Sequence, residues 1–236
     1  DGLAPGDIVV DGGNAKDTES QARARAFAER HIDFIDAGVS GGLWGLEYGY
    51  GLMVGGPDAA VDRLQPIFAT LAPPEGGFIH AGPSGAGHFT KMVHNGIEYG
   101  LMQAYGEGFA LLAAADEFAM DREKLAAIAE SWRTGTVIRS WLLDLAALAL
   151  ANDSFDEVVG YVDDSGEGRW TVQDAVDRGV PVPAMAGALF DRFGSREPTL
   201  FRNRPLDAPP NHFRRPAGEG RRRRRTRVCA WQGGGR

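Results

Sequence analysis

Residues 87–100 read Gly-His-Phe-Thr-Lys-Met-Val-His-Asn-Gly-Ile-Glu-Tyr-Gly, and the pattern of the chain changes at this stretch. Before it, short apolar runs alternate with helical segments, and several of the runs end in glycines. After it, only the helical period of apolar residues continues. Helices are expected at about 87–116, 121–134, 136–151, 170–179 and 183–193. The sequence therefore predicts an α/β sheet followed by an all-α helical domain that begins with this stretch.

The part before residue 84 predicts a partial Rossmann-type, doubly wound sheet. Strands are expected at 8–10, 32–35, 52–54 and 77–80, and helices at 18–30 and 61–72. Ligands of open α/β sheets bind beyond the strand ends, so the glycine-rich strand exits mark the expected site. We expect a dinucleotide-binding part at 1–83, a helical domain at 84–196 and a tail at 197–236.

No nucleotide-binding fingerprint of the GxGxxG type opens the chain. Residues 82–87 match the spacing, but Pro83 and the preceding strand context are wrong, so we interpret them as a turn into the long helix. The chain also lacks an initiator methionine. The sequence predicts either that no dinucleotide binds or that the first strands of the fold are missing, which is an N-terminal truncation.

Composition excludes several classes of protein. The single cysteine, Cys229, excludes an internal disulfide framework and a cysteine metal cluster, and no metal site is expected. No apolar run reaches the ~18 residues that a membrane span needs. No signal peptide opens the chain. These features predict a cytoplasmic protein that has no membrane partner.

The tail differs in charge from the rest of the chain. Residues 196–236 carry 12 Arg against 3 acidic residues, although the whole chain has a net charge of -7. Such a segment cannot bury a core, so it is expected to be disordered. We considered a nucleic-acid-binding arm, a solvated tail and out-of-frame translation of a GC-rich gene. We favour the third interpretation, which resequencing of the locus would test, and we expect no nucleic-acid partner.

The strongest group of chemical side chains lies on one face of the first long helix. Lys91, His94, Asn95 and Glu98 follow the spacing i, i+3, i+4 and i+7. Lys91 and Glu98 lie about 10 Å apart along the axis, which leaves room for a small substrate. A buried amine can take a hydroxyl proton, and a carboxylic acid can return a proton to carbon. The alternative is a solvated polar face with a Lys–Glu pair.

Two glycines in this helix argue against the solvated alternative. Gly96 and Gly100 each cost about 1 kcal/mol relative to alanine in a helix interior. We interpret this cost as a sign that another backbone or a ligand approaches the helix closely.

Two loops have the residues to bind anionic groups. Gly38-Val39-Ser40-Gly41-Gly42, with Asn14 at an earlier strand exit, exposes backbone N–H groups that can hold a carboxylate. Arg169 follows the glycine-rich stretch 163–168, where its guanidinium suits phosphate binding. The alternatives are a tight structural loop and a loop that leads into a helix.

Three separated stretches resemble the 6-phosphogluconate dehydrogenase family. They are Asp11-Gly12-Gly13-Asn14, the run from Gly38 to Gly42 that continues to Gly55-Gly56, and the run from Gly85 to Gly100. The last stretch is highly specific for that family. Residues 165–171 resemble the family's Gly-Thr-Gly-Lys-Trp-Thr motif, with Arg in place of Lys. The resemblance covers residues 1–196 and is closest to the short bacterial form.

The resemblance implies oxidation of the substrate C3 hydroxyl with NAD or NADP, followed by decarboxylation to ribulose 5-phosphate. Lys91 would be the base for that hydroxyl, and Glu98 would protonate C1. Substrate would be bound by Ser40, Gly41, Gly42, His94, Asn95, Tyr99, Arg169 and Arg196. Asn14 would lie near both substrate and nicotinamide. The family also implies a homodimer, and the sequence leaves the choice between NAD and NADP open.

Three departures from the family pattern bear on activity. The nucleotide fingerprint is absent, Leu43-Trp44 replaces a Glu pair of the longer form, and the C-terminal Arg-x-x-Phe-Gly-x-His segment is not found. They predict poor folding, weak substrate binding and no turnover for the chain as written. One rival is another β-hydroxyacid dehydrogenase of the 3-hydroxyisobutyrate type, from which His94 and Glu98 discriminate. The other is a non-catalytic truncated fragment that only dimerises.

Overall fold

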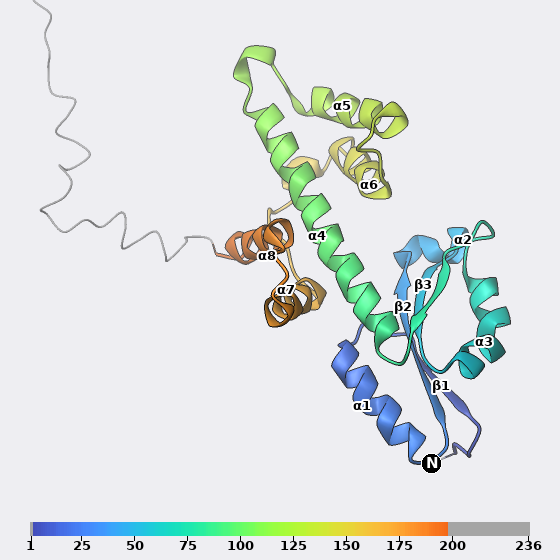
Figure 1. The fold of residues 1–236 in the computed structure, drawn as a ribbon. Helices are drawn as coiled ribbons and strands as arrows, with labels where there is room; N and C mark the ends of the chain where they lie inside the picture. The colour runs from blue at the N-terminus through green and yellow to red at the C-terminus, as the bar shows by residue number, and fades with distance from the viewer. Residues whose placement is uncertain (1, 198–236) are drawn as a thin grey trace, which may run out of the picture. The chain divides into compact units, whose positions relative to one another are not determined.

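The computed structural model describes residues 2–197, and their fold confirms the predicted class. Four strands form one sheet in the order β1-β2-β3-β4. The strands are β1 (Ile8–Asp11), β2 (Asp33–Ser40), β3 (Gly51–Gly55) and β4 (Phe78–Gly82). A helical part follows the sheet (Figure 1).

One strand pair departs from the parallel arrangement of a doubly wound sheet. Strands β1 and β2 are parallel, as are β3 and β4, but β2 and β3 are antiparallel. The link from β2 to β3 holds only a 3-10 turn, η1 (Gly42–Trp44), and the short helix α2 (Gly45–Tyr48). A parallel crossover needs a dozen or more residues, so this short link returns the chain in the opposite direction.

The side chains of β2 alternate between the two faces of the sheet, and a different helix packs on each face. Ile35 and Ala37 join the buried core beneath α3 (Asp58–Leu71). Phe34 stacks on Phe27 of α1 (Asp17–Ala28) with ring centroids 5.8 Å apart. Successive side chains of a strand point to opposite faces, so α1 and α3 lie on opposite sides of the sheet (Figure 1).

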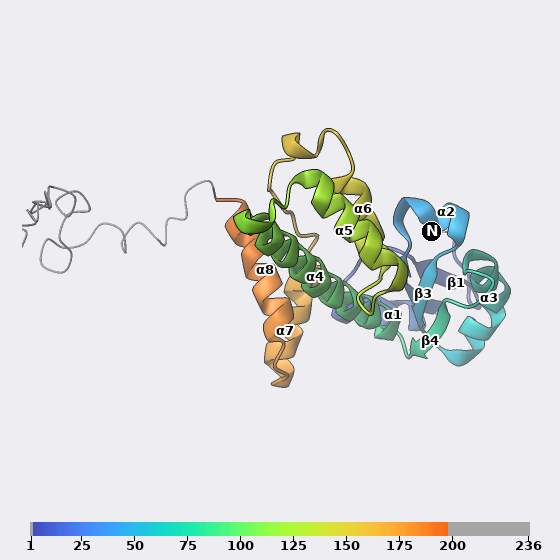
Figure 2. The same ribbon diagram turned by 90° about the horizontal axis from the view of Figure 1, so that it is seen from above.

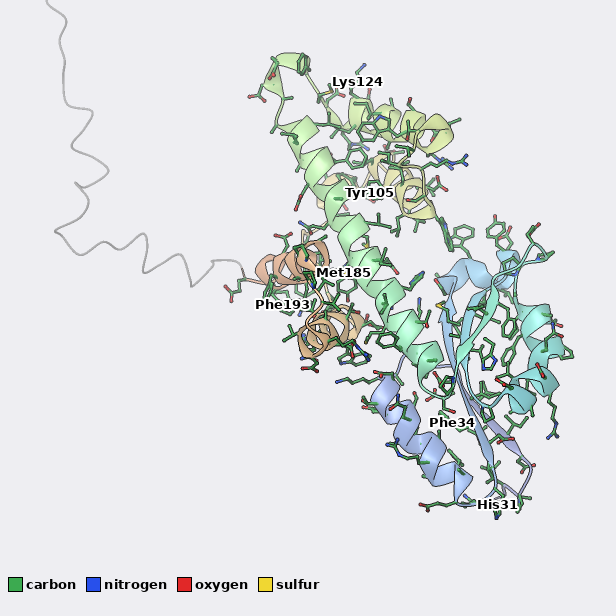
Figure 3. All side chains as sticks on the ribbon, in the orientation of Figure 1. His31, Phe34, Tyr105, Lys124, Met185 and Phe193 are labelled. Carbon is green, nitrogen blue, oxygen red and sulfur yellow. The ribbon has the colours of Figure 1, made fainter. Side chains whose placement is uncertain are left out.

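The helix α4 (Ala86–Ala113) contacts β2 and β3 at its start and then continues into the helical part (Figure 2). The other helices are α5 (Arg122–Gly135), α6 (Trp141–Leu150), α7 (Glu167–Arg178) and α8 (Pro183–Ser195), with 3-10 turns η2 (Asp116–Phe118) and η3 (Phe155–Glu157). Tyr105, labelled in Figure 3, ties α4 to the start of α6, because its hydroxyl lies 2.6 Å from the Ile138 carbonyl oxygen.

Several element boundaries differ from the sequence-based ones. The strand expected at 32–35 continues to Ser40. The helix expected from 136 begins at Trp141, because the Ser140 hydroxyl caps it by accepting from the Leu143 N–H at 3.1 Å. Helix α7 begins three residues early, at Glu167, where Gly166 takes the left-handed φ of 108°.

A compact unit ends at Arg196. The predicted tail lies outside the described residues, apart from Glu197. Across residues 2–197, no helix is both long and apolar enough to cross a membrane.

Candidate active site

Most of the predicted site residues line one cavity of about 890 Å³. They come from the exit of β1, the end of β2 and one face of α4. The predicted residues that line the cavity are Asn14, Ser40, Gly41, Gly42, Lys91, His94, Asn95 and Glu98. Eight of the eleven predicted site residues therefore share one cavity, and its volume is within the ~300–1,000 Å³ range of small-molecule pockets.

The alternate residues of β2 place α4 against the sheet. Asp36 is fully buried, and its carboxylate accepts the backbone N–H groups of Gly85 at 2.6 Å and His88 at 2.8 Å. Gly38, two residues further, leaves no room for a Cβ because the Lys91 side chain fills that space. Two residues of a strand advance by about 6.7 Å, and one turn of a helix advances by about 5.4 Å. Because these distances are similar, every second residue of β2 contacts a successive turn of α4.

His94 joins the polar groups of the cavity. Its Nε2 lies 3.5 Å from the Ser40 hydroxyl, at the end of β2. Its Nδ1 lies 3.0 Å from the Asn95 Oδ1 and 3.4 Å from the Lys91 Nζ. The Glu98 carboxylate lies 4.0 Å from the same Nδ1. An Nδ1–H that donates to Asn95 leaves Nε2 free to accept from Ser40, so one neutral tautomer satisfies both contacts.

Lys91 is the buried cation of this face, with 7% of its surface exposed. Burial lowers the pKa of Lys91 below its usual value, because the charged ammonium loses solvation. The negative charges of Glu98 and then Glu167 oppose that shift. An amine with a lowered pKa is a better proton acceptor near neutral pH, which is the chemistry expected of this residue.

The two helical glycines have different environments. A Cβ on Gly96 would lie 2.7 Å from Thr171 Cγ2 of α7, so the expected close approach is confirmed there. At Gly100 no other element of the described residues makes such an approach, because an added Cβ would meet nothing within 4 Å outside the local helix. The difference arises because α7 crosses α4 at Gly96, and the sequence alone cannot place that crossing.

A second cavity of about 310 Å³ adjoins the first, because Asn95 and Glu98 line both. Tyr99 lines the second cavity, and its hydroxyl accepts the Ser165 N–H at 3.3 Å. Arg192 of α8 also lines it, with its guanidinium 3.6 Å from the centre of the Tyr99 ring. Sequence reasoning missed Arg192, although it lies in a helix that was expected and four residues before Arg196.

Arg169 and Arg196 line neither cavity, and both contact one carboxylate instead. The Asp164 carboxylate lies 3.1 Å from Arg169 Nη2 and 2.7 Å from Arg196 Nη2. The Asp164 side chain is 2% exposed. Burial alone would raise the pKa of Asp164, but the hydrogen bonds from Arg196 and Arg169 lower it below its usual value. Asp164 itself lines the second cavity, so its carboxylate connects the guanidinium groups of Arg169 and Arg196 to that cavity.

An apolar wall of the first cavity was not expected. Trp141, Leu142 and Leu145 of α6 line it, opposite the polar face of α4. Trp44 also lines it, whereas the neighbouring Leu43 is 97% exposed. Nothing in the local sequence of α6 distinguishes these side chains from ordinary core residues, since only the fold brings α6 to the cavity.

Two family models match the chain. The NAD binding domain of 6-phosphogluconate dehydrogenase matches residues 1–82, and the C-terminal domain of 6-phosphogluconate dehydrogenase matches residues 87–203. The order of the two matches follows the order of the sheet and the helical part.

Curated relatives carry the same family name. An NAD(+)-dependent, decarboxylating 6-phosphogluconate dehydrogenase of Haloferax volcanii is 48% identical over 202 residues, which is 84% of this chain and 64% of that protein. YqeC of Bacillus subtilis is 41% identical, over 89% of this chain and 70% of that protein. The chain spans 41% of the length of a relative from Schizosaccharomyces pombe. It is therefore shorter than the relatives that it matches.

Solved structures have the same fold. The 6-phosphogluconate dehydrogenase of Plasmodium falciparum superposes with a TM-score of 0.76 at 33% identity, over 82% of this chain and 43% of that one. A 3-hydroxyisobutyrate dehydrogenase of Salmonella typhimurium superposes with a TM-score of 0.66 at 19% identity, over 81% of this chain and 65% of that one, which shows a shared fold alone. Because the chain matches both family models and relatives above 40% identity, it belongs to the 6-phosphogluconate dehydrogenase family.

Proposed function

We propose that this chain forms the substrate site of an enzyme that oxidises and decarboxylates 6-phosphogluconate to ribulose 5-phosphate with NAD or NADP. The observation that carries the proposal is the pair of adjoining cavities on α4. The larger holds a buried lysine and a carboxylate, and the smaller is lined by Arg192 and by Asp164, the carboxylate that pairs with Arg169 and Arg196. A substrate with a carboxylate at one end and a phosphate at the other can extend through both.

The substrate carboxylate and hydroxyl groups are placed in the larger cavity. Ser40, Gly41 and Gly42 lie at the end of β2, where small residues leave backbone N–H groups accessible. Asn95 lines both cavities and can bind a hydroxyl group at their junction. His94 presents its ring between Ser40 and Lys91.

The substrate phosphate is placed in the smaller cavity. Tyr99 and Arg192 line it directly. Arg169 and Arg196 reach the phosphate by exchanging the Asp164 carboxylate for it, because a guanidinium binds either anion with the same fork of donors. Arg192 joins the predicted set because its guanidinium already lies beside the Tyr99 ring.

The proton transfers are assigned to two side chains of α4. Lys91 takes the proton of the C3 hydroxyl and returns it to the carbonyl oxygen that oxidation creates. Its ammonium form stabilises the negative charge that develops on that oxygen as carbon dioxide leaves. Glu98 donates a proton to C1 of the resulting enediol, from a position two helical turns beyond Lys91, while Lys91 takes back the proton of the former C3 hydroxyl and the carbonyl of ribulose 5-phosphate forms.

The nicotinamide group fits beside Asn14. This residue lies at the exit of β1 and lines the larger cavity, so its amide can bind a polar carboxamide next to the substrate. Val39 and Met53 of the sheet supply an apolar wall for a flat ring. When bound, NAD or NADP accepts the hydride from C3. Lys91 faces the same cavity and is within reach of a hydroxyl on that carbon.

We also propose a homodimer, which the resemblance implies. Large apolar side chains are exposed on the helical part, among them Leu111 at 75%, Val137 at 98% and Leu148 at 59%. Burial of such side chains against a second copy would stabilise the pair by about 25 cal/mol per Å² of apolar area. Sedimentation equilibrium tests this, and a strictly monomeric chain at high concentration would contradict it. A fragment that dimerises without binding substrate remains the second candidate.

Calorimetric titration with 6-phosphogluconate tests the proposed function. We expect saturable binding, weaker binding of gluconate, and none of 3-hydroxyisobutyrate. Loss of one charge-assisted contact costs about 1.5–3 kcal/mol, so Arg192→Ala and Arg169→Ala should each weaken binding roughly 10- to 150-fold. Arg25→Ala on the exposed side of α1 is the matched control and should bind like wild type. Equal affinity for gluconate and 6-phosphogluconate would exclude the phosphate site.

Turnover is measured separately, as formation of NADH or NADPH with 6-phosphogluconate. Lys91→Ala and Glu98→Gln should abolish any turnover that the wild-type chain shows. Dimerisation of a folded chain that binds no substrate would support the non-catalytic fragment instead.

A further inference from the structure

A buried carboxylate at the start of α7 has no role in the mechanism above. Glu167 is the first residue of α7 and only 2% exposed. Its Oε2 accepts from the Ser165 hydroxyl, whereas its buried Oε1 has no hydrogen-bond partner among the described residues. Neighbouring arginines do not compensate it, because Arg169 and Arg196 both pair with Asp164. Burying an acidic group with an unpartnered oxygen costs stability, which indicates that Glu167 has a role other than stabilising the fold.

The position of Glu167 relative to α4 is fixed by close packing. The Thr171 hydroxyl lies 2.8 Å from the carbonyl oxygens of both Glu167 and Met92. A Cβ on Gly168 would overlap the ring of Tyr99, so the first turn of α7 lies directly on α4. Met92 follows Lys91 in the sequence, and this contact therefore holds the Glu167 backbone beside the segment of α4 that carries the lysine.

Lys91 lacks an acidic partner in direct contact. Its ammonium lies 3.4 Å from His94 Nδ1, and no carboxylate of the described residues approaches within the 4.0 Å of an ion pair. The negative charges of Glu98 and Glu167 both raise the pKa of Lys91, against the larger effect of burial. Glu98 lines the cavity, whereas Glu167 is buried in the first turn of α7 and lines neither cavity.

The environment of Lys91 contains few other titratable groups. Strand β3 and helix α6 present only Met53, Ser140 and apolar residues to the cavity. The titratable side chains that line the cavity with Lys91 are His94 and Glu98. The buried titratable groups on the elements packed against α4, among the described residues, are Asp17 of α1, Asp36 of β2 and Glu167 of α7, and α4 itself buries His88 and Tyr99.

We propose that Glu167 is a positioning residue of this site, a second acidic group that acts on the Lys91 ammonium through space while Glu98 faces the substrate. Without it, burial would keep the lysine neutral over a wider pH range. The lysine must be neutral to accept the C3 hydroxyl proton and charged to stabilise the developing oxyanion, so both forms must be accessible. The inference rests on the proposed function for its purpose, but its test measures Lys91 directly.

The chain is suited to that measurement because it contains three lysines, Lys16, Lys91 and Lys124. Trace acetylation of the full chain across roughly pH 6 to pH 11, followed by peptide mass spectrometry, gives a reactivity midpoint for each lysine. Glu167→Gln removes the charge and keeps the shape. We expect the Lys91 midpoint to move to lower pH, with about threefold or greater reactivity at a fixed pH below it. The midpoints of Lys16 and Lys124 should not move.

Matched variants separate this role from a purely structural one. Asp177→Asn removes a charge from an exposed position of the same helix and should leave the Lys91 midpoint unchanged. Glu98→Gln should shift it in the same direction as Glu167→Gln. If the Glu167→Gln variant does not fold, the Glu167→Thr variant is used in its place, because it removes the same charge with a smaller polar side chain.

An unchanged or higher Lys91 midpoint in a folded Glu167→Gln variant would overturn the inference, and Glu167 would then serve only to stabilise the start of α7. That outcome leaves the proposed function intact if wild type still binds or turns over 6-phosphogluconate. Conversely, a chain without turnover still reports the Lys91 midpoint, so failure of the proposed function and failure of the inference are distinguishable.

Discussion

The Ser40 hydroxyl lies 3.5 Å from His94 Nε2, which links the end of a strand to a helix 54 residues later in the chain. Alternate residues of β2 form a row of contacts with α4 and the turn before it. Asp36 caps the start of α4, Gly38 packs on Lys91, and Ser40 ends the row. Strand β2 therefore positions the polar face of α4 as well as contributing to it. The proposed site depends on this row, because the loop proposed to bind the carboxylate and the residues proposed to transfer protons come from its two sides.

Loss of the Ser40 hydroxyl should weaken substrate binding without unfolding the protein. Ser40→Ala removes one hydrogen bond of about 0.5–1.5 kcal/mol at a partly exposed position, so affinity for 6-phosphogluconate should fall roughly 2- to 13-fold. Calorimetric titration measures the affinity, and circular dichroism checks the fold. Ser154→Ala, in the exposed loop after α6, is the control that should leave binding unchanged.

Asp36 is expected to contribute strongly to stability. Asp36→Ala would leave the buried N–H groups of Gly85 and His88 without acceptors, which costs about 2–5 kcal/mol in total. Urea unfolding at neutral pH measures the loss. Asp33→Ala, at the exposed start of the same strand, should change the free energy of unfolding by less than about 0.5 kcal/mol. Equal effects of the two variants would contradict the capping role.

Two glycines of α4 should respond to alanine in opposite ways. A Cβ on Gly87 would overlap the backbone oxygens of Asp36 and Met53, so Gly87→Ala should destabilise by at least about 3 kcal/mol. Gly100 has open space around an added Cβ, so Gly100→Ala should stabilise the helix by about 1 kcal/mol. Thermal unfolding of both variants compares them. Destabilisation by Gly100→Ala would show that another surface packs there.

The Asp164 carboxylate should give a defined pH dependence of stability. Its pKa in the folded protein lies below its usual value because Arg196 and Arg169 bind the charged form. A lowered folded-state pKa stabilises the protein above the unfolded pKa, and this contribution disappears as the pH falls through the folded pKa. Asp164→Asn should therefore be less stable than wild type at neutral pH, and the gap should close below about pH 4.

Urea unfolding at several pH values measures that gap. Asp163→Asn is the control, because the Asp163 side chain is 76% exposed and its pair with Arg196 is screened by solvent. A gap that stays constant down to acid pH would contradict the ion-pair explanation.

Sequence alone determined the family, the fold class and the polar face of α4 that lines the cavity. Spacing is sufficient for that face, because Lys91, His94, Asn95 and Glu98 lie on one helix whose geometry is local. The glycine-rich strand exits were also readable, since ligand sites lie beyond strand ends in α/β sheets. The antiparallel direction of β3 followed from a short link that sequence reasoning did not weigh.

Only the tertiary structure decided which residues meet across elements. It placed Trp141 of α6 against the first cavity and Arg192 of α8 against the second, and it paired Arg169 with Asp164. It also buried Glu167 at the start of α7 and gave Gly96 and Gly100 different environments. These relationships depend on where α6, α7 and α8 cross α4. A helix crossing is set by the packing of side chains from distant segments, and no local pattern encodes it.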